Sequence, residues 1–570
     1  MSGENGALRR AEVVVVGAGH NGLVAACYLA KAGLDVLVVE RWATPGGMTS
    51  TNPMAPEAPD HLINEASIHA SLFRTTNIDN ELELSKKYGL RQRLIDPAHV
   101  HLSPEGESIA MWRDPMRTVE EIRRFSKRDA QKWVELSNII AKATAIGLPM
   151  MQTNPVRPEL KNVIAALKAV GRGRKELKEI IRWVSISQRE AIEEYFEHPM
   201  VRGPLTVNLP FMHFDADLSG WGLIYLGVLQ KWGVAMFEGG TGAFPAALIR
   251  CLEAHGGRVR LSAPVNELTV HAGRVTGVRL ESGEEITATK AVVTACGPSI
   301  VLNKMLPAGM LPDKLAHAAA NIPTTSTGWG NTKINVALNG KVSLPLHQEW
   351  RRKNLPGDPV DLRLSCVTWS THEQSLIAGE ACIKGEVPEM IPGLSQVTTA
   401  FDPKMAPEGH DTWWFWSGLV PCKPNEDWDT VRKQIEDRVL KDCAQYYEGL
   451  ESFEIARRTL TPHDLESRFG APDGNVYHVD PIVTRFGPSR PAMGLGGYKT
   501  PVPGLYLSGS GTHPIAGING MPGMNAAKTM IKALKKDAGG AGIETAAHRA
   551  NVATTTNGST PAPTTPAGVS

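Results

Sequence analysis

Residues 13–40 read VVVVGAGHNGLVAACYLAKAGLDVLVVE, and the hydrophobic pattern of this stretch changes twice. Four valines predict a short buried strand, the alanine-rich segment after them predicts a helix, and an apolar run ending at Glu40 predicts a second strand. Three glycines, Gly17, Gly19 and Gly22, lie where the first strand turns into the helix. Glycines at this spacing, with an acidic residue about 20 positions later, form the dinucleotide-binding fingerprint. The stretch therefore predicts a Rossmann-type α/β unit.

Each residue of the fingerprint has a physical role. Gly17 permits the tight turn, Gly19 lets a pyrophosphate approach the backbone, and Gly22 lets the helix pack on the strand. Free N–H groups and the dipole at the helix N-terminus favour phosphate binding. Glu40 can accept hydrogen bonds from a ribose diol and would repel a 2′-phosphate.

Two further glycine-rich segments favour FAD over NAD. Residues 45–49 (PGGMT) bring the backbone close to a cofactor again, farther along its length than an NAD domain needs. Near the C-terminus, residues 504–511 predict an apolar strand followed by a glycine turn. Residues 513–527 then lead into a helix expected over 528–536, whose N-terminus could stabilise negative charge on a reduced flavin.

In residues 17–22, 45–49 and 505–527 the chain resembles the flavin-dependent amine oxidase and phytoene desaturase superfamily, and within it the phytoene dehydrogenase-like branch. The C-terminal segment departs from the family pattern at Ile515 and Ala516, where glycines are usual, so we expect a reshaped loop near the flavin. The resemblance extends from residue 12 to about residue 536. It implies FAD as the cofactor, with the adenine at the backbone of Val265. The FAD-binding residues that it implies are Gly17, Gly19, His20, Asn21, Gly22, Glu40, Arg41, Gly46, Gly47, Met48, Thr49, Val265, Gly509, Gly517, Asn519, Gly520, Met521, Pro522 and Asn525.

The spacing of these segments predicts an α/β protein with a discontinuous FAD-binding domain and an inserted α+β substrate-binding domain, as in amine oxidases and phytoene desaturases. The FAD-binding domain is expected to comprise residues 11–75, 236–300 and 490–537. The substrate-binding domain is expected to comprise residues 76–235 and 301–489. Residues 538–570 are rich in Gly, Ala, Thr and Pro, which predicts a disordered tail.

Apolar residues at helical spacing predict that the first insertion is mostly helical over residues 120–146 and 160–196. In the second insertion, strands are expected over 331–338 and 411–419. A helix is expected over 427–447. Trp413, Trp414 and Trp416 alternate along the second of these strands, which is typical of core packing.

Bulk properties exclude several classes of function. A net charge of +1 over 570 residues gives no electrostatic case for nucleic-acid binding. Seven cysteines without a Cys-x-x-Cys pair argue against a disulfide framework, a zinc site or a disulfide reductase. No run reaches the roughly 18 apolar residues that a spanning helix needs. We therefore expect a cytoplasmic protein without a metal, and the sequence leaves the oligomeric state open.

A basic cluster beside an apolar stripe leaves two interpretations open. One is a helix that lies on a membrane surface, through which a lipid-like substrate enters. The other is a solvated helix face, because Glu176 and Glu179 interrupt the positive charge. The basic residues are Lys161, Lys168, Arg172, Arg174, Lys175, Lys178 and Arg182.

Few polar residues are candidates for catalysis, because in flavin dehydrogenation the cofactor carries the hydride step. His513 belongs to the loop expected to meet the flavin, and Tyr477 and His478 lie in a turn that resembles a family segment preceding the active site. For each of them, a structural hydrogen bond is the competing interpretation. His213 and Tyr225 lie in an apolar stretch and are expected to line a pocket or the core.

The resemblance implies an enzyme that introduces a carbon–carbon double bond into a hydrophobic small molecule, such as an isoprenoid, a carotenoid precursor, or a ring ketone or acid. Two alternatives on a similar scaffold are amine oxidation and the reverse reaction, as in retinol saturase. A non-enzymatic binder like the Rab GDP-dissociation inhibitors is disfavoured, because a flavin-free protein need not keep the glycine segments. Fold alone does not decide among these reactions.

Overall fold

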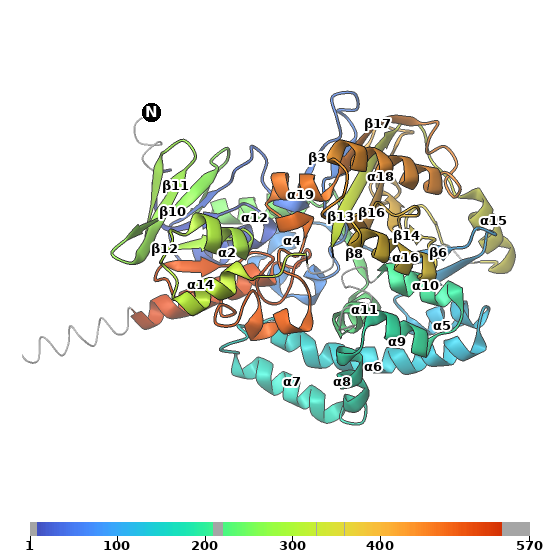
Figure 1. Cartoon of the computed structure of the whole chain (residues 1–570), viewed down its shortest axis with the longest axis horizontal. Helices are drawn as coiled ribbons and strands as arrows, with labels where there is room; N and C mark the ends of the chain where they lie inside the picture. The colour runs from blue at the N-terminus through green and yellow to red at the C-terminus, as the bar shows by residue number, and fades with distance from the viewer. Residues whose placement is uncertain (1–7, 209–219, 326–327, 358–359, 538–570) are drawn as a thin grey trace, which may run out of the picture.

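The computed structural model describes residues 8–208, 220–325, 328–357 and 360–537, and these form two lobes, each built on a seven-stranded sheet (Figure 1). A layer of helices from the segment between residues 115 and 232 lies along one side of both lobes. His213 and the tail predicted over residues 538–570 lie outside the described residues.

The first sheet has the Rossmann arrangement that the fingerprint predicts. Its strand order is β10-β11-β12-β1-β2-β9, with β18 also paired to β12. The pairs β12–β1, β1–β2, β2–β9 and β12–β18 are parallel, and β10, β11 and β12 are antiparallel. The strands are β1 Arg10–Val16, β2 Val36–Val39, β9 Arg258–Arg260, β10 Val265–His271, β11 Arg274–Leu280, β12 Glu285–Thr294 and β18 Leu505–Leu507.

The valines of β1 are buried on both faces of this sheet. Val13 and Val15 belong to the core shared with the helices α2 (His20–Lys31) and α12 (Ala243–Ala254). Val14 and Val16 belong to a second core on the opposite face. Burial on both faces explains why the strand reads as an unbroken apolar run rather than as an alternating one.

The second sheet supplies part of the wall of a large cavity that lies between the two lobes. Its strand order is β17-β13-β16-β15-β14-β6-β7. β6 pairs in parallel with β14, whereas the other neighbouring pairs are antiparallel. The strands are β6 His99–Leu102, β7 Ser108–Met111, β13 Trp329–Leu338, β14 Cys366–Thr368, β15 Leu394–Val397, β16 Asp411–Pro421 and β17 Glu454–Leu460.

The helical segment is broken more often than the sequence pattern predicts. The helix expected over 120–146 is two helices, because Ser126 caps the second one and ends the run. The single run expected over 160–196 is three helices, separated near Gly173 and at the N-cap Ser187. The helices are α5 Pro115–Arg123, α6 Lys127–Met151, α7 Leu160–Arg172, α8 Leu177–Ser185, α9 Gln188–Tyr195, α10 Pro199–Asn208 and α11 Gly220–Trp232.

The other elements complete the two lobes. The helix expected over 528–536 begins earlier, and residues 521–537 are helical. No helix among the described residues is both long and apolar enough to cross a bilayer. The remaining strands are β3 Thr51–Pro53, β4 Leu62–Asn64, β5 Gln92–Ile95 and β8 Val234–Phe237, and the remaining helices are α3 Ile78–Leu82, α4 Leu84–Lys87, α13 Pro298–Ile300, α14 Asp313–Ala320, α15 Pro345–Asn354, α16 His372–Ile383, α17 Thr398–Phe401, α18 Trp428–Cys443 and α19 Pro462–Phe469.

Candidate active site

A cavity of about 490 Å³ extends from the turn between β1 and α2 to the second sheet, which contributes His99, Leu394 and Trp416 to its wall. Residues from segments distant in sequence therefore meet around one space. Of the predicted cofactor residues, those that line the cavity are Gly17, Gly19, His20, Asn21, Glu40, Arg41, Gly46, Gly47, Met48, Thr49, Val265 and Gly517.

The glycine turn at the start of α2 leaves room for a ligand. Gly17 has φ +98°, a conformation that side chains rarely adopt. A Cβ on Gly22 would lie 2.1 Å from the Gly17 carbonyl oxygen, so this contact requires glycine. A Cβ on Gly19 would meet nothing within 4 Å, which marks open space where a phosphate can approach the backbone. The N-terminus of α2 also has no side-chain cap, so its N–H groups are available to an anion.

The Glu40 carboxylate connects the glycine turn after β1 with the segment after β2 through hydrogen bonds. The Ala18 N–H donates to Glu40 Oε2 (2.7 Å) and the Trp42 N–H donates to Oε1 (3.0 Å). An ionised carboxylate has about four acceptor positions, so Glu40 can still accept hydrogen bonds from a ribose. The Gly46 N–H donates to the Ala18 carbonyl (2.9 Å), which brings the second glycine loop against the first. These residues fit the diphosphate and ribose of a dinucleotide.

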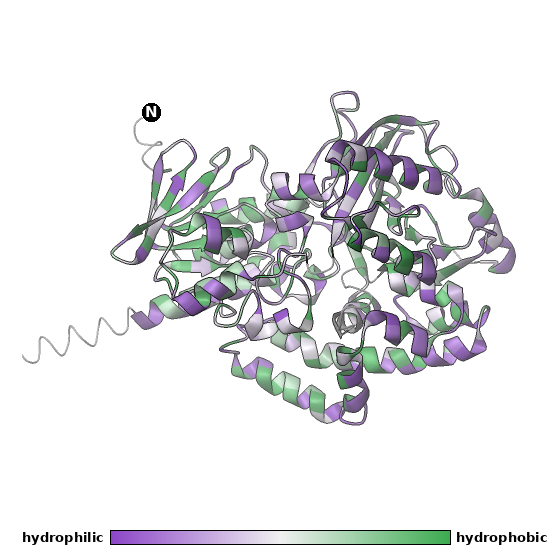
Figure 2. Cartoon of the chain, viewed as in Figure 1, coloured by the Kyte–Doolittle hydropathy of each residue, from purple (hydrophilic) through white to green (hydrophobic). Residues whose placement is uncertain are grey.

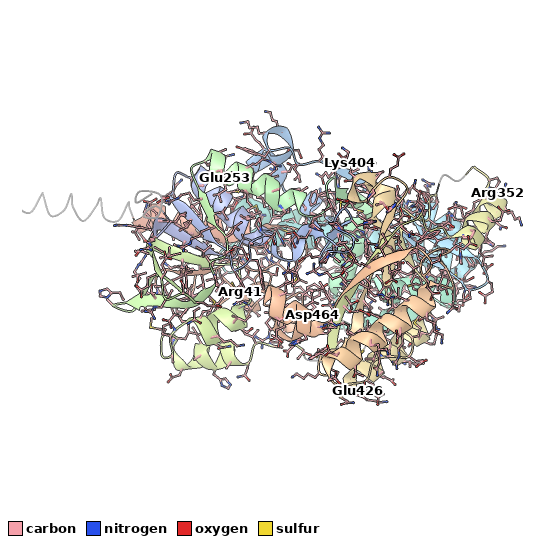
Figure 3. All side chains as sticks on the ribbon, turned by 90° about the horizontal axis from the view of Figure 1, so that it is seen from above. Arg41, Glu253, Arg352, Lys404, Glu426 and Asp464 are labelled. Atoms are coloured by element: carbon pink, nitrogen blue, oxygen red, sulfur yellow. The ribbon has the colours of Figure 1, made fainter. Side chains whose placement is uncertain are left out.

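The rim of this end reaches α19 of the second lobe. In Figure 3, Arg41 of the first lobe and Asp464 of α19 are labelled in the same part of the view. The Trp42 Nε1–H donates to the Arg468 carbonyl of α19 (2.7 Å), and the Arg41 guanidinium lies 3.4 Å from Glu281. The dinucleotide end is therefore closed by both lobes.

The C-terminal glycine loop forms the wall farther along the cavity. His20 Nε2 lies 3.1 Å from the Gly517 carbonyl, and the Asn21 amide donates to Ser510 Oγ (3.3 Å). Ala516, one of the two departures from the family pattern, lines the cavity, and Ile515 is fully buried beside it. The loop is thus fixed to the start of α2 through these contacts.

Several predicted cofactor residues, most of them in or just after this loop, do not line the cavity. The Asn519 amide donates to the carbonyls of Ile515 and Ala516, and the Asn525 amide donates to the Met151 carbonyl at the end of α6. The structure gives these side chains a role in holding the loop. The residues outside the cavity wall are Gly22, Gly509, Asn519, Gly520, Met521, Pro522 and Asn525.

The other end of the cavity is apolar, and no charged side chain of the described residues lines it. Tyr225, Leu394 and Trp416 line it together with His69 and His99. Trp416 is therefore not simply core packing as expected, whereas Trp413 and Trp414 are buried in the sheet. The carboxylates in the cavity wall are Glu40 and Glu281, both at the dinucleotide end. Burial lowers the pKa of His69 to about 4 and the pKa of His99 to about 3, so both imidazoles are neutral at physiological pH.

Residues 22–521 match the family model described as flavin containing amine oxidoreductase. The chain belongs to this family. FAD is therefore its cofactor, and the protein is an FAD-dependent oxidoreductase. The fold expected from the glycine segments, an amine-oxidase-like and phytoene-desaturase-like arrangement, is confirmed.

Several known proteins are similar to the flavoenzyme over nearly its whole length. Pyridine nucleotide-disulfide oxidoreductase domain-containing protein 2 of Rattus norvegicus is 29% identical, covering 94% of this chain and 96% of its own. A neurosporene-forming phytoene desaturase of Cereibacter sphaeroides is 24% identical, with 91% and 93% covered. Among solved structures, cyclohexylamine oxidase from Brevibacterium oxydans superimposes with a TM-score of 0.56 at 16% identity, with 92% and 99% covered.

The three candidate catalytic residues of the flavoenzyme have different positions. Tyr477 and His478 line the cavity, whereas His513 does not, and His513 Nε2 lies 3.0 Å from the Met150 carbonyl. Burial lowers the pKa of His478 to about 4 and raises the pKa of Tyr477 well above its ordinary value, so both are neutral. His478 has φ +60°, and its Nδ1 has no hydrogen-bond partner in the part of the chain that the structure describes.

Arg490 was missed by sequence reasoning, although it holds the turn that carries Tyr477 and His478. Its guanidinium is fully buried and donates to the carbonyls of Tyr477 (2.9 Å) and Thr512 (3.2 Å), among others. Burial lowers its pKa to about 9. Arg490 therefore joins this turn to the flavin loop, and no local motif marks it.

Lys333 on β13 is a second buried cation that the sequence did not reveal. Its Nζ donates to the carbonyls of Asn64 (2.6 Å) and Ser67 (3.1 Å), and Ser67 lines the cavity. Burial lowers the pKa of Lys333 to about 7. With this pKa, Lys333 changes its charge near neutral pH, and it lies behind the part of the cavity wall that contains Ser67.

One group of metal-ligating side chains also lies at this end. The ligand atoms of His69, His99 and Cys366 all lie within 4.8 Å of one another, so this group could hold a soft metal ion. Burial raises the pKa of the Cys366 thiol well above its ordinary value, which favours the protonated form. The expectation of a metal-free enzyme stays a prediction.

Proposed function

We propose that the protein is an FAD-dependent dehydrogenase that introduces a carbon–carbon double bond into a neutral hydrophobic molecule. The observation that carries this proposal is the apolar end of the cavity, where neutral imidazoles and aromatic rings line the wall and both carboxylates lie at the opposite end. A cationic substrate would find no counter-charge there among the described residues, whereas an apolar one gains free energy from leaving water.

When bound, FAD accepts a hydride at its flavin N5. The protein residues then have three tasks: to orient the substrate, to exclude water and to take up the proton that leaves the neighbouring carbon. Tyr225, Leu394 and Trp416 supply an apolar wall for the first two tasks. We assign the proton to the neutral imidazole of His478, because its ring lines the cavity.

Amine oxidation is the second candidate, supported by the family model and by the likeness to cyclohexylamine oxidase. Aromatic residues at the apolar end, Tyr225, Trp416 and Tyr477, would suit a cationic or neutral amine. The reverse reaction, saturation of a double bond, requires the same arrangement with reduced flavin. Amine oxidation does not explain why no acidic side chain of the described residues lines this end, whereas saturation is as compatible with this wall as desaturation is.

The purified flavoprotein is titrated anaerobically with limonene, carvone and cyclohexylamine in turn, and flavin reduction is followed by absorbance. We expect bleaching by the hydrocarbon or the ketone, together with a product that has lost two hydrogens in mass spectrometry. Bleaching by the amine alone would contradict the proposal and support amine oxidation. Reoxidation of the pre-reduced flavin by an alkene, with a product that has gained two hydrogens, would support saturation.

His478→Gln tests the assigned proton acceptor. Because a positioned general base typically contributes about 10²–10⁴-fold, we expect flavin reduction to slow by at least 100-fold. FAD content is expected to stay at the wild-type level, since His478 is not among the residues that bind phosphate or ribose. His513→Gln is the matched control, because that imidazole does not line the cavity. Equal rates for His478→Gln and wild type would contradict the assignment.

A further inference from the structure

We propose that His99 and His69 form a binding site for an uncharged oxygen of the substrate, so that the substrate is an oxygenated hydrophobe, such as a ketone or an alcohol, rather than a pure hydrocarbon. This inference rests on the proposed function and names the class of substrate.

The two histidines meet through the pairing of strands that are distant in sequence. His99 is the first residue of β6 and lies opposite Cys366 of the parallel strand β14. His69 comes from the segment after β4, and its Nε2 lies 3.4 Å from Cys366 Sγ. The His69 ring also contacts the Trp414 ring edge-on, with centroids 6.2 Å apart. The sheet therefore holds both imidazoles at one place in the cavity wall.

His99 has a hydrogen-bonding capacity that the protein does not use. Its side chain is 3% exposed and lines the cavity, and the structure gives it no hydrogen bond to any described residue. Because an unpaired polar group in an apolar site is costly, a retained imidazole here favours a ligand that completes its hydrogen bonds.

The charge of the surroundings defines the class of ligand. A neutral imidazole donates one N–H, which suits a carbonyl or hydroxyl oxygen. In the part of the chain that the structure describes, no carboxylate lines this end, so a cation is not favoured, and the Lys333 side chain already donates to the carbonyls of Asn64 and Ser67. A carbonyl held here would also acidify the C–H beside it, so that a modest base such as His478 suffices for the proton.

The test compares limonene with carvone, which carries a ketone on the same ring skeleton. Binding to the oxidised holoenzyme is measured from the perturbation of the flavin spectrum, independently of turnover. A single hydrogen bond to a neutral partner corresponds to a difference of about three- to tenfold in Kd, so carvone is expected to bind tighter by this factor. His99→Phe is expected to abolish the preference, and His99→Gln, which keeps a donor, is expected to retain part of it.

His101→Gln is the matched control, because His101 lies on the same strand and does not line the cavity. Equal Kd values for the two compounds in the wild type, or an unchanged preference in His99→Phe, would overturn the inference. Stoichiometric zinc or copper in the purified protein, lost in His99→Phe, would also overturn it and identify a metal centre. A carvone preference without any flavin reduction would support the binding site and contradict the proposed reaction, so the two failures are distinguishable.

A second inference comes from a different surface. We infer that α7 binds the surface of an anionic lipid bilayer through an apolar stripe formed by Leu160, Ile164 and Leu167. These side chains are 72%, 42% and 64% exposed, at the i, i+4, i+7 spacing of one helix face. Figure 2 shows hydrophobic residues along α7, which lies at the edge of the molecule. Val156, before the helix, and Ile181, on α8, are exposed as well.

The basic residues beside the stripe indicate what kind of surface α7 binds. Lys161 of this segment pairs with Glu159, and Arg182 pairs with Glu179 and Glu194, so these positive charges are partly neutralised. The remaining five basic residues have no ion pair with a residue that the structure describes, and all are exposed. An apolar stripe flanked by uncompensated positive charge fits an anionic lipid surface better than a second protein. The five residues are Lys168, Arg172, Arg174, Lys175 and Lys178.

The position of α7 connects this surface with the active site. It follows the end of α6, where the Met150 carbonyl lies against His513 of the flavin loop and the Met151 carbonyl accepts from Asn525 of the helix over residues 521–537. A hydrophobic substrate dissolved in a bilayer would therefore be delivered close to the flavin loop, which forms part of the cavity wall.

Vesicle co-sedimentation tests this surface with the full-length flavoprotein. Binding is expected to vesicles that contain phosphatidylglycerol and not to vesicles of phosphatidylcholine alone. The double variant Leu160→Ser, Leu167→Ser is expected to bind the anionic vesicles at least tenfold more weakly. A control with two other exposed apolar residues outside the stripe, Leu346→Ser with Ile377→Ser, is expected to bind as the wild type does.

Two outcomes would overturn the lipid assignment. One is wild-type protein that stays in the supernatant with both kinds of vesicle. The other is a wild-type dimer in light scattering that becomes monomeric in the Leu160→Ser, Leu167→Ser variant, which would show that the stripe is covered by a second copy of the chain.

Discussion

Single residues at the β1–α2 turn separate two roles of glycine. Gly22 is required for packing, because its Cβ position is filled by the Gly17 carbonyl, whereas Gly19 faces open space. The difference is invisible in the spacing of the fingerprint, yet it decides what a substitution does. A side chain at Gly22 disturbs the fold, and a side chain at Gly19 meets the cofactor instead.

Gly19→Val is therefore expected to give folded, colourless protein. The valine side chain fits the protein alone and fills the space that the pyrophosphate needs, so FAD affinity is expected to fall by more than tenfold. Flavin absorbance per polypeptide and the circular dichroism spectrum measure the two effects. Gly171→Ala, in open space on α7, is the control and is expected to retain full flavin. A yellow Gly19→Val protein would refute this placement of the diphosphate.

Lys333 gives a pH dependence of stability whose sign follows from its burial. Its pKa is lowered to about 7 in the folded protein, from 10.5 as the ordinary value. Between these values the unfolded chain binds more protons, so the free energy of unfolding rises as pH rises from about 7 toward 10. Over this pH range, the unfolding free energy of the wild type is expected to increase relative to that of Lys333→Met.

Urea denaturation at several pH values measures this difference for the two proteins. Parallel pH profiles for wild type and Lys333→Met would contradict a depressed pKa at this position.

At the scale of elements, helices and loops from opposite ends of the chain support one another. The helix over residues 521–537 packs on α2 at Gly523, where a Cβ would lie 2.1 Å from the Asn21 carbonyl oxygen. Asn525 on the same helix holds the end of α6. The flavin loop is thus positioned by α2 on one side and by α6 on the other.

Gly523→Ala tests this contact. The added methyl group forces α2 and the C-terminal helix apart, which is expected to cost about 1–3 kcal/mol of stability and to weaken FAD binding. Thermal denaturation with and without added FAD measures both effects. An Ala variant with wild-type melting temperature and flavin content would show that the contact relaxes without cost.

At the scale of the whole molecule, the cavity joins the two lobes, because both sheets contribute to its wall. FAD is therefore expected to stabilise both lobes together. At a free FAD concentration of 100 times Kd, the linkage contributes about 2.7 kcal/mol. Calorimetry is expected to show one transition in the holoprotein and a lower melting temperature after FAD is removed, reversed when FAD is added back. Two separate transitions, one of which has a melting temperature that does not change with FAD, would contradict this coupling.

The sequence by itself determined the parts of this protein that depend on local patterns. The β1–α2–β2 unit follows from glycines and an acid at fixed spacing, because backbone conformation and close approach depend on neighbours in the chain. FAD and the residues expected to bind it came from the family resemblance of the glycine segments, and most of those expected at the dinucleotide end line the cavity. The helices of the first insertion were found, but their breaks at Ser126 and Ser187 were not, since a capping serine competes weakly with a continuous apolar pattern.

Only the tertiary structure decided the character of the apolar end. His69, His99, Lys333 and Arg490 come from segments separated by tens to hundreds of residues, and none lies in a motif. Strand pairing between β6 and β14 places His99 beside Cys366, and burial makes the imidazoles neutral. Solvent exclusion and long-range pairing are properties of the folded chain, so the chemistry of this end could not be derived from local sequence.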